Sequence, residues 1–240
     1  MPNFLGVHPA RGGSKSIPKK NIKEFCKKPL IAWTIEAAQK SGVFDRLILS
    51  TDDKEIAAVA EKQGVEIPFL RPAELAEDKT PHLPVMQHAV KWLQDNQNYF
   101  PDYVTILQPT SPLRQSWHIK EVAELLEKTR ADSVVSVIEI PSHFNPLWAL
   151  KMDAKGLVRL FVSGEPMRKR IYQRQLLPKV YIHNSAIYIF KRELLFDKNE
   201  PNFYGDKVVG YVMEEKYSAN IDNLKDWAEA EKNIQELGLA

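Results

Sequence analysis

The sequence predicts an α/β protein built on a doubly wound, mostly parallel sheet. Over the first two thirds of the 240 residues, short apolar runs typical of buried strands alternate with runs in which apolar residues recur at helical spacing. Gly42 and Gly64 directly follow two of the helical runs, at positions where helices commonly end. Such alternation implies parallel strands joined by crossover helices. The length suits one sizeable domain, and we expect residues 1–240 to form it.

The expected elements follow one another regularly up to residue 140. The strands cover 4–7, 46–51, 103–107 and 133–140, and the helices cover 30–38, 52–60, 84–94 and 119–126. The second helix begins at Asp52, which forms an acidic capping box with Glu55. Prolines, a turn and basic residues then predict an arm inserted at 142–179. The expected elements after the arm are strands over 186–190 and 208–213 and a helix over 224–237.

Composition argues against several classes of protein. The net charge of +2 disfavours wholesale binding to nucleic acid or to a membrane surface. One cysteine, Cys26, cannot form an internal disulfide, which favours a reducing compartment. The N-terminus lacks the features of a signal peptide, and no run approaches the ~20 apolar residues of a membrane span. These observations predict a soluble, cytoplasmic protein.

The loop after the first expected strand is the most informative stretch. It reads Ala-Arg-Gly-Gly-Ser-Lys-Ser-Ile-Pro-Lys-Lys-Asn over 10–21. Paired glycines allow backbone N–H groups to approach an anion, and Arg11 and Lys15 supply positive charge. Its place at a strand's carboxyl end is where open α/β sheets bind ligands. The spacing matches neither a Walker A loop nor G-x-G-x-x-G. A solvated basic loop is the competing interpretation, and a nucleic-acid patch is disfavoured because no aromatic residues are interleaved.

Residues 10–21 resemble the signature loop of the acylneuraminate cytidylyltransferases, which are the CMP-sialic acid synthetases and their relatives. The resemblance implies a nucleotidyltransferase fold of Rossmann-like type. It further implies a CTP site formed by Ala10, Arg11, Gly12, Gly13, Ser14, Lys15 and Asn21. Arg11, Lys15 and Lys20 would contact the triphosphate. Ser16 departs from the pattern, because the family usually has glycine there.

The run Leu-Gln-Pro-Thr-Ser-Pro-Leu-Arg over 107–114 fits the same family. By resemblance Gln108 contacts the sugar, and we place Thr110 and Ser111 in the sugar site with it. The two prolines stiffen the loop. A proline-rich turn that starts a helix is the alternative, but it gives no reason for Gln108 or Arg114.

Two other segments, 71–80 and 181–188, also resemble family motifs. The first approaches the cytidine in the relatives, and the second resembles an Asn-Gly-Ala-Ile-Tyr strand in which Ser185 here replaces the glycine. The candidates are Arg71 and Thr80 for the nucleotide, and Asn184 and Tyr188 for the sugar. Core packing is an alternative role for Tyr188.

Near the C-terminus, the family usually places two acidic residues where this chain has Asn220 and Asp222. The resemblance implies that both lie near Mg²⁺. If the segment is a strand, residues two apart share one face and can share one ion. Mg²⁺ accepts a neutral amide oxygen as a ligand. Because Asn220 offers such an oxygen in place of a charged carboxylate, weaker metal binding is expected. The competing role is capping of the last helix by Asp222 or Asn223.

Together these motifs imply transfer of CMP from CTP to the anomeric hydroxyl of a nine-carbon acidic sugar, with Arg11, Lys15, Lys20 and Asp222 as the catalytic residues. In the family the arm crosses to a second subunit, which implies a homodimer, and Arg174 is our candidate for the sugar carboxylate. A nucleotidyltransferase for another sugar acid and a catalytically impaired CTP-binding relative remain alternatives.

Overall fold

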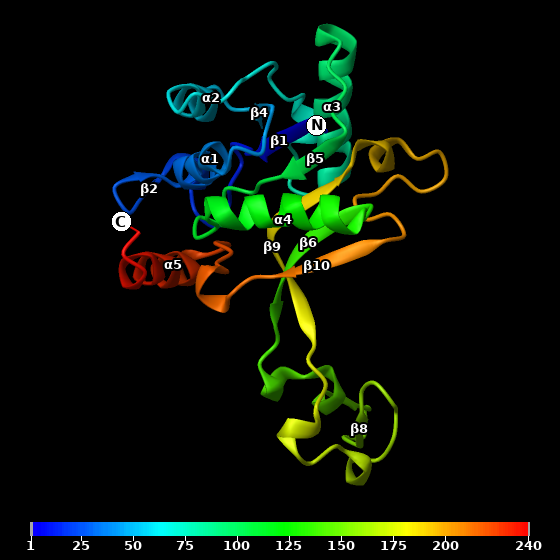
Figure 1. Ribbon diagram of the computed structural model, residues 1–240. Helices are drawn as coiled ribbons and strands as arrows, with labels where there is room; N and C mark the ends of the chain where they lie inside the picture. Colours follow the sequence, from blue (N-terminus) through cyan, green and yellow to red (C-terminus); the bar gives the residue numbers. More distant parts are fainter. Residues whose placement is uncertain (1, 240) are drawn as a thin grey trace.

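The computed structural model describes residues 2–239 and confirms the α/β architecture (Figure 1). One six-stranded sheet has the order β10-β6-β9-β5-β1-β4. Its strands are β1 (Phe4–Pro9), β4 (Arg46–Ser50), β5 (Tyr103–Ile106), β6 (Ser133–Glu139), β9 (Tyr181–Lys191) and β10 (Val208–Val212). β9 runs antiparallel to β5 and β6, whereas the other neighbouring strands pair in parallel. Short antiparallel pairs are formed by β2 (Glu24–Phe25) with β3 (Lys28–Pro29) and by β7 (Leu150–Met152) with β8 (Val158–Leu160).

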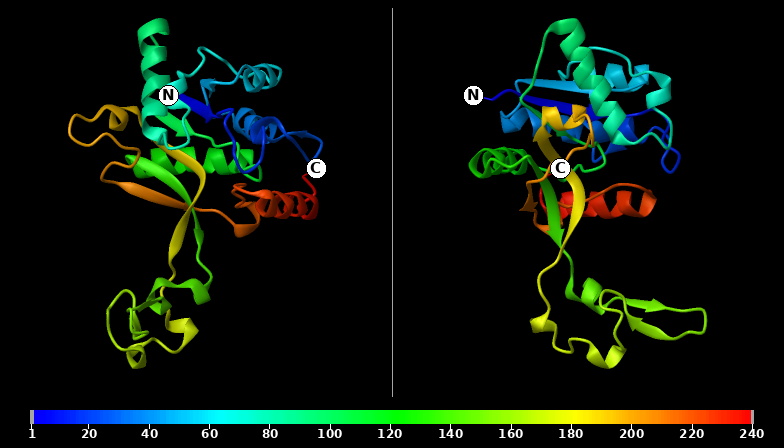
Figure 2. Two further views of the ribbon diagram at one scale, coloured as in Figure 1. Left: turned by 180° about the vertical axis from the view of Figure 1, so that it is seen from behind. Right: turned by 90° about the vertical axis from the view of Figure 1, so that its right-hand side faces the viewer.

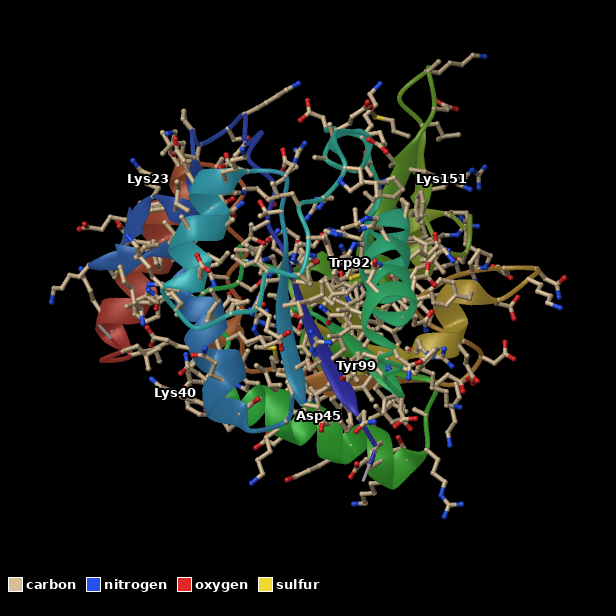
Figure 3. The ribbon with its side chains drawn as sticks, turned by 90° about the horizontal axis from the view of Figure 1, so that it is seen from above. Lys23, Lys40, Asp45, Trp92, Tyr99 and Lys151 are labelled. Carbon is tan, nitrogen blue, oxygen red and sulfur yellow. The ribbon has the colours of Figure 1, made fainter. Side chains whose placement is uncertain are left out.

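Helices cover both faces of the sheet. They are α1 (Leu30–Ser41), α2 (Lys54–Glu61), α3 (His82–Gln97), α4 (Ser116–Thr129) and α5 (Leu224–Glu236). The alternation of side chains along β1 divides the core, because Phe4 packs with residues of α1 and α4 while Leu5 and Val7 pack with residues of α3. Figure 3, seen from above, shows β1 between α3 and the pair α1 and α4. Within residues 2–239, no helix is both long enough and apolar enough to cross a bilayer.

Three helix starts differ from the prediction. α4 begins at Ser116 rather than at residue 119. α3 begins at His82 rather than at Pro84, since the first turn of a helix has free N–H groups and therefore accepts a proline. The cap of α2 is Asp53 and not Asp52: its carboxylate accepts hydrogen bonds from the backbone N–H groups of Glu55 and Ile56. Asp52 is thereby left for another partner, described below.

Residues 141–180 protrude from the body as an arm connected by the far ends of β6 and β9 (Figures 1 and 2). The arm contains the β7–β8 hairpin and several 3₁₀ turns. It exposes large apolar side chains, namely Phe144, Met152, Phe161, Tyr172 and Leu176. A concentration of exposed apolar side chains commonly marks an interaction surface. The predicted use of the arm in dimerisation stays a prediction.

Ser185 interrupts the regular pairing of β9. Its φ of 59° lies in the left-handed region, which is unfavourable for residues other than glycine. The register between β6 and β9 shifts between Val135 and Val137, opposite this residue. The backbone at position 185 thus adopts a conformation that suits the glycine that the family motif has there.

Candidate functional site

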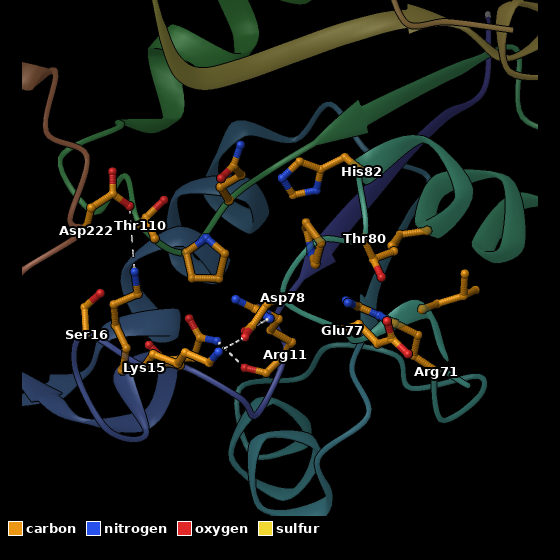
Figure 4. A pocket seen from close by; sticks show the side chains of 18 residues that line it. Arg11, Lys15, Ser16, Arg71, Glu77, Asp78, Thr80, His82, Thr110 and Asp222 are labelled. Carbon is orange, nitrogen blue, oxygen red and sulfur yellow. Dashed lines mark hydrogen bonds and ion pairs between the residues drawn. The ribbon is translucent and has the colours of Figure 1, made fainter. Parts of the chain in front are cut away.

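A cleft of about 550 Å³ opens at the carboxyl ends of β1 and β5, where Pro9 and Gln108 line it (Figure 4). Open α/β sheets bind ligands at this edge. Ten of the residues predicted from the sequence line the cleft together: Arg11, Ser14, Lys15, Lys20, Asn21, Arg71, Thr80, Gln108, Thr110 and Asp222. The structure therefore brings the glycine-containing loop, the segment 71–80, the loop after β5 and the segment before α5 to one place.

The loop 10–21 is held by contacts to its own backbone. The N–H of Gly12 donates to Oδ1 of Asp52 (3.0 Å), and Nδ2 of Asn21 donates to the carbonyl of Arg11 (3.0 Å). A methyl group on Gly12 would lie 2.5 Å from Oδ2 of Asp53, so a larger residue here must displace the carboxylate that caps α2. Asp52, predicted as a helix cap, instead fixes the loop. Ala10 is buried behind it and does not line the cleft.

Arg11 and Lys15 converge on a single carboxylate from across the cleft. Nη1 of Arg11 lies 2.7 Å from Oδ1 of Asp78, and Lys15 forms an ion pair with the other oxygen. Figure 4 shows the three side chains meeting within the cavity. Hydrogen bonds from Lys15 and Arg11 lower the pKa of Asp78, so this carboxylate stays ionised. Two cations that hold one carboxylate between them can equally hold phosphate oxygens.

Lys20 and Asp222 mark the opposite side of the cleft. Nζ of Lys20 donates to the carbonyl of Ile221 (2.7 Å) and lies 4.0 Å from Oδ1 of Asp222. Burial lowers the pKa of Lys20, Asp222 acts in the opposite direction, and Arg11 adds to the lowering. The Asp222 side chain is 67% exposed and therefore accessible to a ligand.

Arg71 and Thr80 line the cleft, but their polar groups already have protein partners. The guanidinium of Arg71 is buried and donates from Nε to Oγ of Ser50 (3.0 Å) and from Nη2 to the Ser50 carbonyl. Burial lowers the pKa of Arg71 to about 10. The hydroxyl of Thr80 donates to the carbonyl of Glu74 (3.2 Å). Arg71 therefore fixes the wall of the cleft to β4, and Thr80 is held by its own segment.

The predicted sugar residues divide into two groups. Gln108 and Thr110 line the cleft, whereas Ser111, Arg174, Asn184 and Tyr188 do not. Asn184 is buried: its Oδ1 accepts from Oγ of Ser136 (2.6 Å) and its Nδ2 contacts Sδ of Met213 (3.3 Å), so its amide links β6 and β9 to the core. Arg174 lies in the arm, at the start of η6 (Arg174–Leu176).

Tyr188 is half-buried against the core under α3, which is the packing role considered for it. Its hydroxyl donates to Oγ of Ser185 (3.3 Å) and lies 3.2 Å from Nδ1 of His183. Ser111 is buried at the base of the loop after β5.

The segment from 218 to 223 is a loop, so the strand alternation that was to place Asn220 beside Asp222 is wrong. The two residues still meet, because Nδ2 of Asn220 donates to Oδ2 of Asp222 (2.7 Å). Asn220 itself lies outside the cleft lining. Asn223, not Asp222, caps α5, which leaves the Asp222 carboxylate to the cleft. Across residues 2–239, no three His, Cys, Asp or Glu side chains gather where they could hold a metal ion.

Among the cleft residues that sequence reasoning missed, three carry titratable side chains. Glu77 and Asp78 lie inside the segment that resembles the cytidine motif, but acidic residues are not expected next to a triphosphate, so neither was a candidate. His82 also lines the cleft, at the start of α3, and Figure 4 shows its ring pointing into the cavity. Burial and the nearby Arg71 lower the pKa of His82, which favours the neutral ring. Because the helix was predicted to begin at Pro84, His82 was not placed on it.

Comparison with known proteins agrees with this geometry. A family model described as cytidylyltransferase matches residues 6–239. The chain is 35% identical over 236 residues to the CMP-N,N'-diacetyllegionaminic acid synthase of Legionella pneumophila, covering 97% of this chain and 96% of that protein. It is 33% identical over 223 residues to the N-acylneuraminate cytidylyltransferase of Streptococcus agalactiae, covering 92% of this chain and 51% of that protein. The chain thus spans about half the length of the streptococcal relative.

Among solved structures, CMP:2-keto-3-deoxy-manno-octonic acid synthetase complexed with CTP superimposes with a TM-score of 0.69 over 98% of this chain and 99% of that one. At 14% identity this likeness shows the fold alone. The family model, however, spans nearly all of the described residues, and the Legionella relative matches from end to end. On these grounds the chain belongs to the cytidylyltransferase family.

Proposed function

We propose that this protein transfers CMP from CTP to the anomeric hydroxyl of a nine-carbon acidic sugar of the sialic, legionaminic or pseudaminic acid type, with release of pyrophosphate. The observation that carries the proposal is the convergence of Arg11, Lys15 and Lys20 on one cleft that also contains Gln108 and Asp222. Relatives named for N-acylneuraminate, legionaminic acid and pseudaminic acid support this class of acceptor.

In the proposed reaction the sugar hydroxyl oxygen attacks the α-phosphorus of CTP. A bond forms between this oxygen and the α-phosphorus, and the bond from the α-phosphorus to the oxygen that bridges to the β-phosphorus breaks. Pyrophosphate leaves with that electron pair, and the hydroxyl proton passes to solvent water. Negative charge accumulates on the phosphate oxygens, so positioning and electrostatic stabilisation account for most of the catalysis. Arg11 and Lys15 hold the leaving phosphates, and Lys20 neutralises charge on the opposite side.

A magnesium ion is part of the proposal. The donor set suits a weakly held Mg²⁺, because one accessible carboxylate, Asp222, faces the cleft and Mg²⁺ takes its other ligands from water and substrate phosphates. Asn220 offers an amide oxygen beside it. When bound, the ion supplies charge neutralisation at the phosphates.

The decisive experiment measures pyrophosphate release with CTP, Mg²⁺ and a panel of nonulosonic acids, and then with ATP, GTP and UTP. We expect release with CTP and at least one acceptor only. Lys15→Met should abolish most of the activity, whereas Lys19→Met serves as a matched control, because Lys19 lies in the same loop but pairs with Glu55 (2.6 Å) outside the cleft. Binding of CTP without release for any acceptor would support an impaired relative instead. Release with an acid outside this class would favour the other alternative.

We also propose that the arm joins two copies of the chain into a homodimer, so that Arg174 serves the partner's cleft. The exposed apolar side chains of the arm support this arrangement, and the absence of Arg174 from the lining of its own cleft is consistent with it. Light scattering at micromolar concentration should give a dimer, and Leu176→Glu on the arm should give a monomer. Phe196→Glu, at an exposed apolar position outside the arm, should leave the dimer intact. A cytoplasmic location, suggested by the single Cys26, completes the proposal.

A further inference from the structure

Arg114 is a fully buried cation beneath the candidate site. Its relative exposure is 1%, and it forms no ion pair with an acidic residue within the described chain. Burial lowers the pKa of Arg114 to about 9, which still leaves the guanidinium charged at neutral pH. A buried charge without a counterion is costly unless its hydrogen bonds are satisfied. Arg114 nevertheless does not line the cleft, so direct contact with a ligand there does not explain its burial.

The guanidinium connects three segments that are far apart in the sequence. Nη1 donates to the carbonyl of Ala186 on β9, and Nη2 donates to Oγ1 of Thr34 on α1 (2.7 Å) and to the carbonyl of Gln108 (3.2 Å). The hydroxyl of Thr34 also donates to the Gln108 carbonyl (3.3 Å), so Arg114, Thr34 and Gln108 are linked pairwise. The planar fork of Arg114 presents separate Nη1 and Nη2 donors to the Ala186 carbonyl on β9 and to the Gln108 carbonyl in the loop after β5, a fixed spread that the compact ammonium of lysine does not offer.

The loop that Arg114 holds is a junction between both sides of the cleft. At its start Gln108 lines the cleft, and two residues later the carbonyl of Thr110 accepts from the N–H of Ile221 (2.9 Å). The carbonyl of Ile221 in turn accepts from Nζ of Lys20, next to Asp222. Hydrogen bonds, joined by the short backbone stretch from Gln108 to Thr110, therefore connect Arg114 to Lys20 and to the segment that carries Asp222. The contacts of Arg11 and Lys15 lie outside these connections.

We propose that Arg114 is a positioning residue, which fixes the loop 107–114 between α1 and β9 and thereby sets the places of Gln108, Lys20 and Asp222 relative to one another. This inference rests on the proposed cytidylyl transfer. Arg114 touches no substrate and acts through the loop alone. The acceptor and the reacting phosphate depend on the alignment of this loop, whereas initial triphosphate binding by Arg11 and Lys15 does not.

The test is steady-state kinetics on Arg114→Lys, Arg114→Met and Thr34→Val, with CTP binding measured separately by calorimetry. We expect kcat to fall at least tenfold and KM for the acceptor to rise in both Arg114 variants, because misalignment by about 1 Å has effects of this order. The Kd for CTP should change by a smaller factor than kcat does, because of the three cations only Lys20 depends on these contacts. Thr34→Val should show the same pattern more weakly, and it remains informative if an Arg114 variant does not fold. Val90→Ala, which truncates a buried side chain of α3 outside the cleft, controls for lost stability.

Each outcome bears on the inference separately from the proposed function. Equal losses in CTP binding, acceptor KM and kcat, matched by Val90→Ala at the same loss of thermal stability, would reduce Arg114 to a structural role and overturn the inference. Full activity of Arg114→Lys would show that charge and not the fork matters, which also overturns it. Absence of pyrophosphate release from the unaltered protein with every acceptor would instead contradict the proposed function.

Discussion

Replacement of Asp78 by asparagine should strengthen the binding of CTP, because the carboxylate occupies the cations that the triphosphate needs. Asp78 lies between Arg11 and Lys15 and pairs with both. A triphosphate must displace it or bind beside a like charge. The perturbation keeps the size of the side chain and removes only its charge. If Asp78 instead helped to hold the nucleotide, its replacement would weaken the binding of CTP.

The expected size follows from the exposure of the pairs. The Lys15 side chain is 81% exposed and that of Asp78 is 37% exposed, so each pair is screened by water. Exposed pairs of this kind shift an equilibrium by factors of about 1.4 to 5 each. With two pairs, the paired state is favoured by about 2- to 30-fold, and the apparent affinity for CTP is reduced by the same factor. Asp78→Asn should therefore lower the Kd for CTP by about 2- to 30-fold.

Calorimetric titration of CTP at 50 mM and 500 mM salt measures the effect. The difference in Kd for CTP between Asp78→Asn and the unaltered protein should be smaller at the higher salt, since salt screens exposed charges. Glu77→Gln is the matched control: Glu77 lines the same cleft but forms no ion pair within residues 2–239, so its neutralisation should change the Kd much less. Cytidine, which lacks phosphates, should bind both variants alike. An unchanged or raised Kd for CTP in Asp78→Asn would refute the reasoning.

Three further outcomes are expected. Gly12→Ala should lower the free energy of unfolding in urea by about 1–2 kcal/mol, because the added methyl group displaces the Asp53 cap of α2, whereas Gly13→Ala, with no atom within 4 Å of the added group, should be close to neutral. Ser185→Gly should raise the melting temperature, since relief of a left-handed conformation is worth about 1 kcal/mol; a lower melting temperature would contradict the strain. The affinity for CTP should decline as the pH rises, and the decline should begin below the ordinary lysine pKa near 10.4. Burial lowers the pKa of Lys20, so its positive charge is lost earlier as the pH rises. Lys20→Arg should flatten that profile, and identical profiles would argue against a role for Lys20.

The sequence predicted the centre of the sheet well because β1 and β5 are buried on both faces and therefore apolar, as in the runs around Val7 and Ile106. After the ends of β1 and β5 it placed Arg11, Lys15 and Gln108 in the cleft, although Ala10 and Ser111 in the same loops are buried and do not line it. It failed where a contact depends on the course of a loop. Asp52 and Asp53 are adjacent acids before one helix, and only the path of the backbone decides which caps the helix and which holds Gly12. Asn184 resembled a ligand residue, yet the packing of β6 against β9 uses its amide.

The charges around the cleft show why acidic residues belong to a site for a polyanion. Besides Arg71, whose guanidinium binds Ser50, three cations line the cleft, Arg11, Lys15 and Lys20, and two of the carboxylates that line it, Asp78 and Asp222, pair with them. Without a counterion, three cations in one cleft would repel one another and destabilise the folded loop. Asp78 neutralises the charges of Arg11 (2.7 Å) and Lys15, and Asp222 lies 4.0 Å from Lys20 and offsets its charge. In the proposed reaction only the Asp78 contacts must be exchanged for phosphate, because we propose Asp222 as the ligand of Mg²⁺. Loop stability and nucleotide affinity are therefore opposed at Asp78, and a variant that binds CTP more tightly there should be the less stable protein in its absence.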